Sequence, residues 1–189
     1  MTSHLDDLIF QQKQLLSLNT VLKAYNCKAD NLLCNKVYTD LLATYNLNES
    51  NIVKDWCSEN FSKSNYHPEK LIFKSPSGNH VRSKSEFFID QALFLNQIPF
   101  RYECKLTLND YEIYPDFTIM HPLTHKIYYW EHFGMMDNPS YSQNAFSKMN
   151  LYNSNGIIPG IDLIMSFESK NNPFTYEKAE AIINQHFKS

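Results

Sequence analysis

The chain has 189 residues and a net charge of −3; 43% of its residues are hydrophobic and 20% are charged. This length allows one domain with a core, or a compact domain with a helical appendage. The net charge excludes a chain that is basic throughout, and no apolar run approaches the ~20 residues of a membrane span.

The cysteines and the N-terminus bear on the cellular compartment. The four cysteines do not form a CxxC pair, so a zinc site is not expected. The first residues lack the pattern of a signal peptide. We therefore expect a cytoplasmic protein with reduced thiols and no membrane contact. The cysteines are Cys27, Cys34, Cys57 and Cys104.

The first third of the chain has a helical pattern. Apolar residues recur at helical spacing and predict helices over about 3–25, 30–45 and 50–60. No motif with a known chemistry occurs in this part. We assign residues 1–75 to a helical N-terminal segment and residues 76–189 to a separate α/β domain.

A basic, turn-rich stretch follows these helices. Residues 61–82 contain "HPEK" and "SPSGNH" and are expected to form a connector. Residues 61–84 hold five basic side chains against one acidic side chain, Glu69. Such a run is often only a solvated surface, but it can also bind phosphate. We expect Lys74, Arg82 and Lys84 to contact nucleic acid. The five basic residues are Lys63, Lys70, Lys74, Arg82 and Lys84.

From Ser83 onward, helical and strand patterns alternate. Ser83 and Glu86 predict a capping box, Pro139 follows a capping Asn138, and Gly156 marks a helix end. The expected order is α-β-β-β-α-β-α, an α/β fold around a mixed sheet. The predicted elements are helix 83–97, strands 100–108, 112–119 and 126–133, helix 138–156, strand 160–168 and helix 175–187.

Two acidic residues occupy neighbouring predicted strands. If 112–119 and 127–133 form a hairpin whose turn lies between Leu123 and Thr124, Asp116 falls opposite Glu131. Directly opposed side chains have Cβ atoms about 5 Å apart, where two like charges are unfavourable without a cation. The alternative is a pair of solvent-facing acids on an edge strand.

Two helical residues are expected to point toward this pair. Glu86 shares a helix stripe with Ile89 and Leu93, although the capping box with Ser83 competes for its carboxylate. Lys148 lies on the stripe of Tyr141, Ala145, Lys148 and Tyr152. The alternative is a surface lysine whose aliphatic stem packs on tyrosines.

This set of residue types suits one chemistry. Two or three carboxylates with a lysine can hold Mg²⁺ (or Mn²⁺) and hydrolyse a phosphodiester. We expect Asp116, Glu131 and Glu86 to be the metal ligands. A nearby lysine can stabilise added negative charge at the phosphate. The sequence contains no P-loop, GxSxG or Gly-rich dinucleotide turn, and it has only four glycines.

Several motifs in the same order resemble a known superfamily. "VRSKSE", "IPFRYE", "YPDFTIMHP", "YYWEHFGMMDNPSY", "FSKMNLY" and "NGIIPGIDLIMSFES" resemble a bacterial branch of the PD-(D/E)XK nucleases over about residues 80–188. The resemblance implies an α-β-β-β-α-β core like that of restriction endonucleases. It also implies that Asp116 is the Asp of PD, Glu131 the acid of (D/E)XK and Glu86 the Glu of the first core helix.

The motif departs from the superfamily at one position. Phe133 stands where the lysine of (D/E)XK is expected. Lys148 resembles a migrated lysine and is our candidate replacement, with His132 as the rival. Strand alternation turns His132 to the opposite face, where packing is the simpler role. Tyr141 is a candidate phosphate contact or a core residue.

Three functions remain open from the sequence. We expect a Mg²⁺-dependent nuclease acting on DNA, and a homodimer is one of its open arrangements. The first alternative is a catalytically inactive nuclease fold that binds nucleic acid or a protein partner, as Phe133 would allow. The second is an interaction module that binds no nucleic acid, which the modest net charge allows.

Overall fold

The computed structural model describes residues 51–188. They belong to a compact unit that spans Ser50–Ser189. The helices predicted over 3–25 and 30–45 lie outside the described residues. A helix covers 51–58, as predicted. None of the helices within 51–188 is long and apolar enough to cross a membrane.

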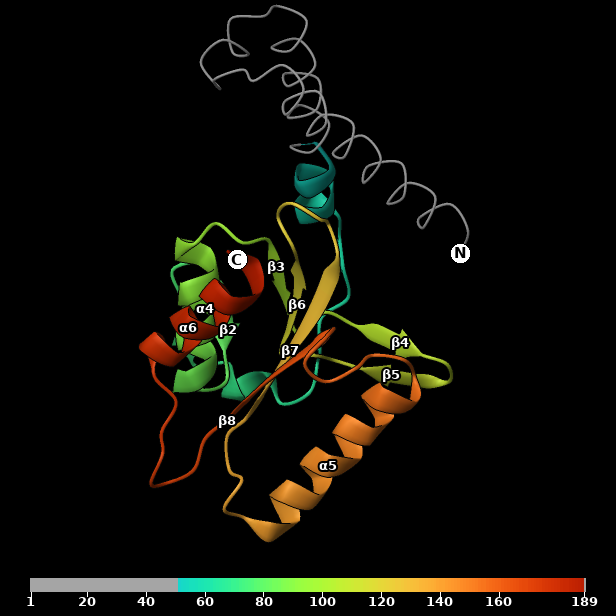
Figure 1. The fold of residues 1–189 in the computed structure, drawn as a ribbon. Coiled ribbons are helices and arrows are strands. Elements are labelled where there is room, and N and C mark those ends of the chain that lie inside the picture. The colour runs from blue at the N-terminus through green and yellow to red at the C-terminus, as the bar shows by residue number, and fades with distance from the viewer. Residues whose placement is uncertain (1–50, 189) are drawn as a thin grey trace, which may run out of the picture. The chain divides into compact units, whose positions relative to one another are not determined.

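The described unit is a mixed α/β domain (Figure 1). A four-stranded sheet has the order β3-β6-β7-β8, and two small hairpins, β1-β2 and β4-β5, accompany it. β3, β6 and β7 are antiparallel neighbours, whereas β8 runs parallel to β7. The elements are η1 Pro68–Lys70, β1 Phe73–Lys74, β2 His80–Val81, α4 Lys84–Leu95, β3 Phe100–Tyr102, β4 Leu106–Leu108, β5 Tyr111–Ile113, β6 Phe117–Met120, β7 Ile127–Phe133, α5 Pro139–Ser154, β8 Leu163–Phe167 and α6 Tyr176–Phe187.

Helices cover the two faces of this sheet. Ile89 of α4 and Ile183 of α6 are fully buried in the main core, together with Phe117 and Trp130 from the sheet. On the other face, Tyr152 of α5 packs in a smaller cluster with residues of β8 and the β4-β5 hairpin. Figure 1 shows α4 and α6 on one side of the sheet and α5 on the other.

The predicted helix ends are confirmed. The Ser83 side chain accepts a hydrogen bond from the Glu86 backbone N–H, and Asn138 caps Pro139–Ser154. Gly156, which follows α5, has a φ of 79°, a left-handed conformation that glycine adopts without strain. Local capping chemistry therefore sets these boundaries.

The predicted hairpin register is also confirmed. Phe117 lies opposite Trp130 in the antiparallel β6-β7 pair, and His121 N–H donates to the Lys126 carbonyl at the turn. One residue further along this register, Asp116 lies opposite Glu131. The turn therefore centres on Leu123 and Thr124, as the sequence predicts.

Two predicted long strands are each broken in the middle, which corrects the strand assignment. The C-terminal part of 100–108 and the N-terminal part of 112–119 leave the main sheet and pair with each other as the β4-β5 hairpin. Glu103 has a φ of 46°, which no regular strand accepts, and Pro115 has no N–H to donate. Both breaks lie directly beside Asp116, since Glu103 N–H donates to the Asp116 carbonyl at 3.0 Å.

The stretch predicted to be a connector is attached to the domain. Lys63 forms an antiparallel bridge with Cys104, and Ser64 N–H donates to the Glu103 carbonyl at 3.2 Å. β1 and β2 form a short hairpin within the same stretch. Residues 61–75, which the sequence analysis groups with the N-terminal helices, thus pack on the α/β domain.

Candidate functional site

The carboxylate pair lies at the bend between β6 and its preceding segment. Glu131 is 2% exposed, whereas Asp116 is only partly buried. Asp116 Oδ2 accepts the His132 backbone N–H at 2.7 Å, which ties its carboxylate to β7. The register and this contact bring the two acids to the same side of adjacent strands, as predicted.

Lys148 reaches this pair from α5. Its Nζ donates to Glu131 Oε2 at 2.7 Å and to the Tyr114 carbonyl at 3.5 Å. Burial lowers the pKa of Lys148, but the charges of Glu131 and Asp116 outweigh it and leave that pKa above the usual value. Lys148, which the helical pattern predicts to face the sheet, therefore lies next to Glu131. The motif of Glu131 has Phe133 at the position where a lysine is expected.

Tyr152 is a site residue that the sequence analysis did not single out. It lies one turn after Lys148 on the same face of α5 and is fully buried. Its hydroxyl donates to Glu131 Oε1 at 2.5 Å, so both carboxylate oxygens of Glu131 have a donor from α5. Its spacing of four residues from Lys148 was the available signal.

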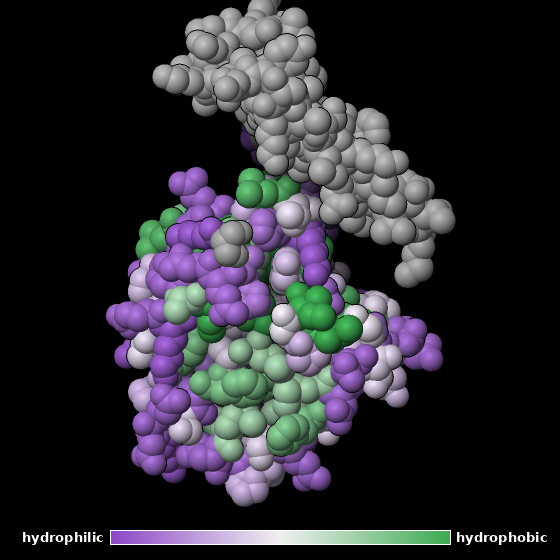
Figure 2. Space-filling model, viewed as in Figure 1, coloured by the Kyte–Doolittle hydropathy of each residue, from purple (hydrophilic) through white to green (hydrophobic). Residues whose placement is uncertain are grey.

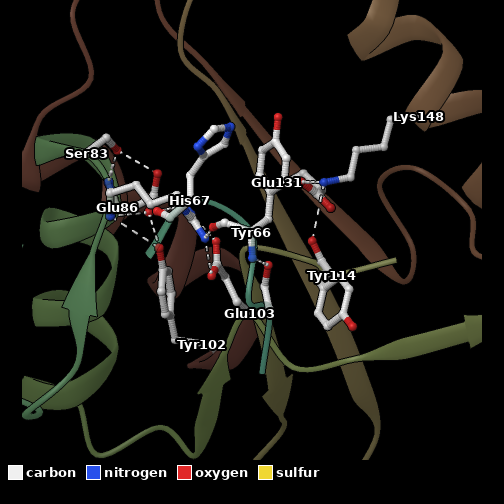
Figure 3. A network of polar contacts seen from close by, with 11 residues as sticks. Tyr66, His67, Ser83, Glu86, Tyr102, Glu103, Tyr114, Glu131 and Lys148 are labelled. Carbon is white, nitrogen blue, oxygen red and sulfur yellow. Dashed lines mark hydrogen bonds and ion pairs between the residues drawn. The ribbon is translucent and has the colours of Figure 1, made fainter. Parts of the chain in front are cut away.

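Glu86 borders the site but is engaged at the N-terminus of α4. Its Oε1 accepts the Ser83 hydroxyl at 2.9 Å, and its Oε2 accepts the Tyr102 hydroxyl at 2.6 Å and the Arg82 N–H at 3.0 Å. Figure 3 shows Glu86 with Ser83 and Tyr102 on one side and Lys148 with Glu131 on the other. Glu86 thus binds groups at the N-terminus of α4, but through the Ser83 hydroxyl and the Arg82 backbone N–H and not through the Ser83 N–H of a capping box.

The acids of the site perturb one another. Burial raises the pKa of Asp116 to about 7, and the neighbouring charge of Glu131 adds to the effect. Burial, followed by the charge of Asp116, raises the pKa of Glu86 to about 7. Burial also raises the pKa of Glu131, against the opposing effect of Lys148. Three acids and one lysine therefore form a cluster with excess negative charge that a cation would relieve.

A surface cavity of about 520 Å³ opens over Asp116 and Lys148. Its wall combines charged groups with aromatic and aliphatic side chains. Figure 3 shows Tyr66, His67 and Glu103 between the Glu86 side and the Lys148 side of the site. The lining residues are Ser64, Tyr66, Arg82, Glu103, Ile113, Tyr114, Asp116, Ser147, Lys148 and Leu151.

His132 points away from this cavity, as strand alternation predicts. Its Nδ1 lies 2.8 Å from Ser166 Oγ, its ring packs 4.7 Å from the Phe174 ring, and its Nε2 is 3.4 Å from Glu168 Oε1. The Nε2 contact is an ion-pair distance without hydrogen-bond geometry. Burial lowers the pKa of His132, so the neutral ring is favoured. These contacts describe a packed core histidine.

The expected phosphate-binding residues do not gather at the cavity. Of the five basic residues between 61 and 84, only Arg82 lines it. The Arg82 guanidinium donates to both carboxylate oxygens of Glu103 and to the carbonyls of Tyr66 and His67. Lys84 lies 5.5 Å from the Phe88 ring centre, and Lys74 belongs to β1. Arg82 is turned inward because Glu103 is buried and needs a counter-charge.

Tyr141 lies at the edge of the site. Its hydroxyl accepts the Gly134 N–H at 3.1 Å. Burial raises its pKa, and the charge of Asp116 contributes to the shift while Lys148 opposes it. The charges of the site therefore affect the pKa of Tyr141. Its hydrogen bond with the Gly134 N–H also holds the turn after β7 in place.

The candidate site within 51–188 offers carboxylates for a metal ion, but not three converging ligands. Among the described residues, no three His, Cys, Asp or Glu side chains converge as ligands for a metal ion. Both oxygens of Glu86 and both of Glu131 accept hydrogen bonds from within the domain, and Asp116 accepts one at Oδ2, so a cation held by Asp116 and Glu131 would have to share or displace the donors of Glu131. Two carboxylates suit Mg²⁺, since this ion retains several waters and needs few protein ligands.

Comparisons with known proteins do not assign a family. No family model, curated protein or solved structure matches this chain.

Proposed function

We propose that the chain is a metal-dependent nuclease of the PD-(D/E)XK type, with DNA as its expected substrate. The observation that carries the proposal is the contact of 2.7 Å between Lys148 and Glu131, beside Asp116 and at an open cavity. Phe133 cannot supply the charge of the motif lysine. Lys148 offers that charge from a different element at the acid where it is needed.

The arrangement of the elements supports the same proposal. Apart from the β4-β5 hairpin between β3 and β6, the chain runs through α4, β3, β6, β7, α5 and β8, as helix, three antiparallel strands, helix and parallel strand. This order agrees with the restriction-endonuclease-like core that the motif resemblance implies. Asp116, directly before β6, and Glu131, in β7, are the residues that the resemblance implies as the acids of the motif.

Each side chain of the site has a proposed role. Asp116 and Glu131 would hold the cation, and Glu86 would add negative charge near Asp116. A bound Mg²⁺ or Mn²⁺ supplies a Lewis acid and a more acidic water. Lys148 orients the attacking water and stabilises the charge that develops on the phosphate. Tyr152 keeps the Glu131 carboxylate in place through Oε1.

One alternative has its own support. The Glu131 and Glu86 oxygens already accept hydrogen bonds from within the domain, and Phe133 occupies the motif position of the lysine. These features also suit a catalytically inactive fold that binds nucleic acid or a protein. The two proposals differ in whether a divalent cation makes the protein cleave a phosphodiester.

A cleavage assay tests the proposal. The full-length chain is incubated with single-stranded, double-stranded and branched DNA, and with RNA, in Mg²⁺, Mn²⁺ or EDTA. We expect metal-dependent cleavage that falls by roughly 10²–10⁴ in Lys148→Ala, the range for a positioned catalytic group. Lys126→Ala, which removes a surface lysine paired with Asp162 at 2.7 Å, is the matched control. Cleavage that persists in EDTA or in Asp116→Asn would refute the nuclease site. Binding without cleavage would favour the inactive alternative.

A further inference from the structure

Tyr66 combines a fixed backbone with an exposed ring. Arg82 Nη2 donates to the Tyr66 carbonyl at 2.5 Å, and the Tyr66 N–H donates to Ser64 Oγ at 3.2 Å. Arg82 also donates to the His67 carbonyl at 2.8 Å. The residue nevertheless remains 72% exposed, and its ring contacts the His67 ring edge to face at 4.1 Å between centroids. A stretch outside helices and strands is thus held in place while its aromatic side chain stays in solvent.

The ion pair beneath Tyr66 explains this rigidity. Arg82 and Glu103 form a two-point contact with donor–acceptor distances of 2.5 and 2.9 Å, and Glu103 is 8% exposed. Arg82 also donates hydrogen bonds to the carbonyls of Tyr66 and His67. An aromatic ring on such a support loses little conformational entropy when a ligand stacks on it.

The cavity joins this ring to the proposed catalytic residues. Tyr66, Tyr114 and Leu151 line the same space as Asp116 and Lys148. The wall of this space therefore combines aromatic and aliphatic side chains with carboxylates and cationic groups. A nucleotide likewise combines a flat base with a charged phosphate.

Tyr66 is a highly exposed aromatic residue. Figure 2 shows apolar residues at the surface of the described unit amid hydrophilic ones. Among the large hydrophobic residues that are exposed within 51–188, Tyr66 has the highest exposed fraction. An exposed aromatic ring offers a flat apolar face on which a planar ligand can stack.

We propose that Tyr66 stacks an unpaired base next to the phosphate that is cleaved, so that the substrate is single-stranded or locally unpaired nucleic acid. This inference rests on the proposed function and narrows its substrate class. Inside a duplex each base face is covered by its neighbours, so away from the duplex ends an exposed ring can stack only on a base that has left the helix. Stacking on aromatic side chains tolerates every base and is typical of single-strand binding.

The test measures binding separately from cleavage. Full-length protein in Ca²⁺ or EDTA is titrated with single-stranded oligonucleotides of about 12 nucleotides, within the range of single-strand sites, and with the matching duplex. DNA and RNA versions are both used. A fluorescent 2-aminopurine in the single strand reports stacking by its quenching. Tyr66→Ala and Tyr66→Phe are compared with Tyr111→Ala, which removes another exposed tyrosine, on β5 and outside the cavity.

The expected result is specific to the ring. Tyr66→Ala should weaken single-strand binding about 5- to 100-fold, the range for loss of one stacked base, and should abolish the quenching. Tyr66→Phe should keep both, because it retains the aromatic face. Tyr111→Ala should match the unmodified chain, and duplex binding should change in neither tyrosine variant.

The outcomes separate this inference from the nuclease proposal. Unchanged single-strand affinity in Tyr66→Ala, or an equal loss for duplex, overturns the stacking site while metal-dependent cleavage can still stand. If the quenching depends on Tyr66 but no cleavage occurs in Mg²⁺ or Mn²⁺, the stacking site is supported and the nuclease proposal is refuted. Absence of binding to every probe overturns both.

Discussion

The contact between Lys148 and Glu131 makes a quantitative prediction about stability. Lys148→Met keeps most of the side-chain volume but removes the ammonium from a carboxylate whose side chain is 3% exposed. Removing one partner of a buried ion pair costs about 3–5 kcal/mol. The Lys148 side chain is 33% exposed, and Tyr152 remains bound to Glu131, so water and the remaining hydroxyl reduce the loss. We expect a decrease in the free energy of unfolding of about 2–3 kcal/mol.

The loss should depend on pH in a defined direction. Lys148 opposes the burial that raises the Glu131 pKa, so the variant raises this folded-state pKa further. A carboxyl with a folded pKa above the unfolded one destabilises the fold as pH rises through that interval. The effect of Lys148→Met should therefore be smallest below about pH 4.3, the ordinary pKa of glutamate, and increase toward neutral pH.

Urea denaturation of the full-length chain between acidic and mildly alkaline pH measures this effect. Lys126→Met is the control, because Lys126 pairs with Asp162 at the same distance of 2.7 Å but is 41% exposed. That surface pair should contribute about 0–1 kcal/mol. Equal losses in the two variants, or a Lys148→Met loss that does not change with pH, would refute the assignment of Lys148 to a buried charge cluster.

Three further predictions concern neighbouring groups. Mg²⁺ should raise the thermal midpoint at pH 8 but not at pH 5, because Asp116 with a pKa of about 7 is protonated at the lower pH; Asp116→Asn should remove the shift in calorimetry. Arg82→Ala should lose about 3 kcal/mol of stability in urea, since Glu103 loses its buried counter-charge, and Arg82→Lys should not restore it; full stability in Arg82→Ala would contradict this. His132→Ala should lose about 2 kcal/mol in urea while the single-turnover cleavage rate falls less than about tenfold; the opposite pattern would make His132 the catalytic group.

The sequence predicted the features that depend on local chemistry. Ser83 and Asn138 were recognisable as helix caps, because the groups that they bind lie within the next few residues. The hairpin register was predictable because the "HPLTHK" turn allows one placement of Asp116 opposite Glu131. Lys148 followed from helical periodicity, since a residue on the inward stripe of α5 must face the sheet.

The features that depend on distant residues were not predictable. The positive φ of Glu103 breaks a segment with a continuous strand pattern, and no local signal marks it. Arg82 was expected to contact nucleic acid, and its pairing with Glu103 was not predictable because that partner is 21 positions away. Tyr66 belongs to a turn-rich stretch, and only the folded chain brings it to the cavity.

The docking of α5 has a consequence for the dynamics of the domain. Only Ala145 and Tyr152 are buried along its 16 residues, so apolar packing alone provides a weak attachment. Polar contacts strengthen the attachment: Lys148 and Tyr152 both donate to Glu131, and the Tyr141 hydroxyl accepts the Gly134 N–H. Any change in the charge of Glu131 is therefore also a change in how firmly α5 is held. In amide hydrogen exchange, α5 should open more readily than α4, and its opening rate should respond to pH and to divalent cations. The opening of α5 would therefore depend on the charge of the site, and hydrogen exchange at α5 would measure that dependence.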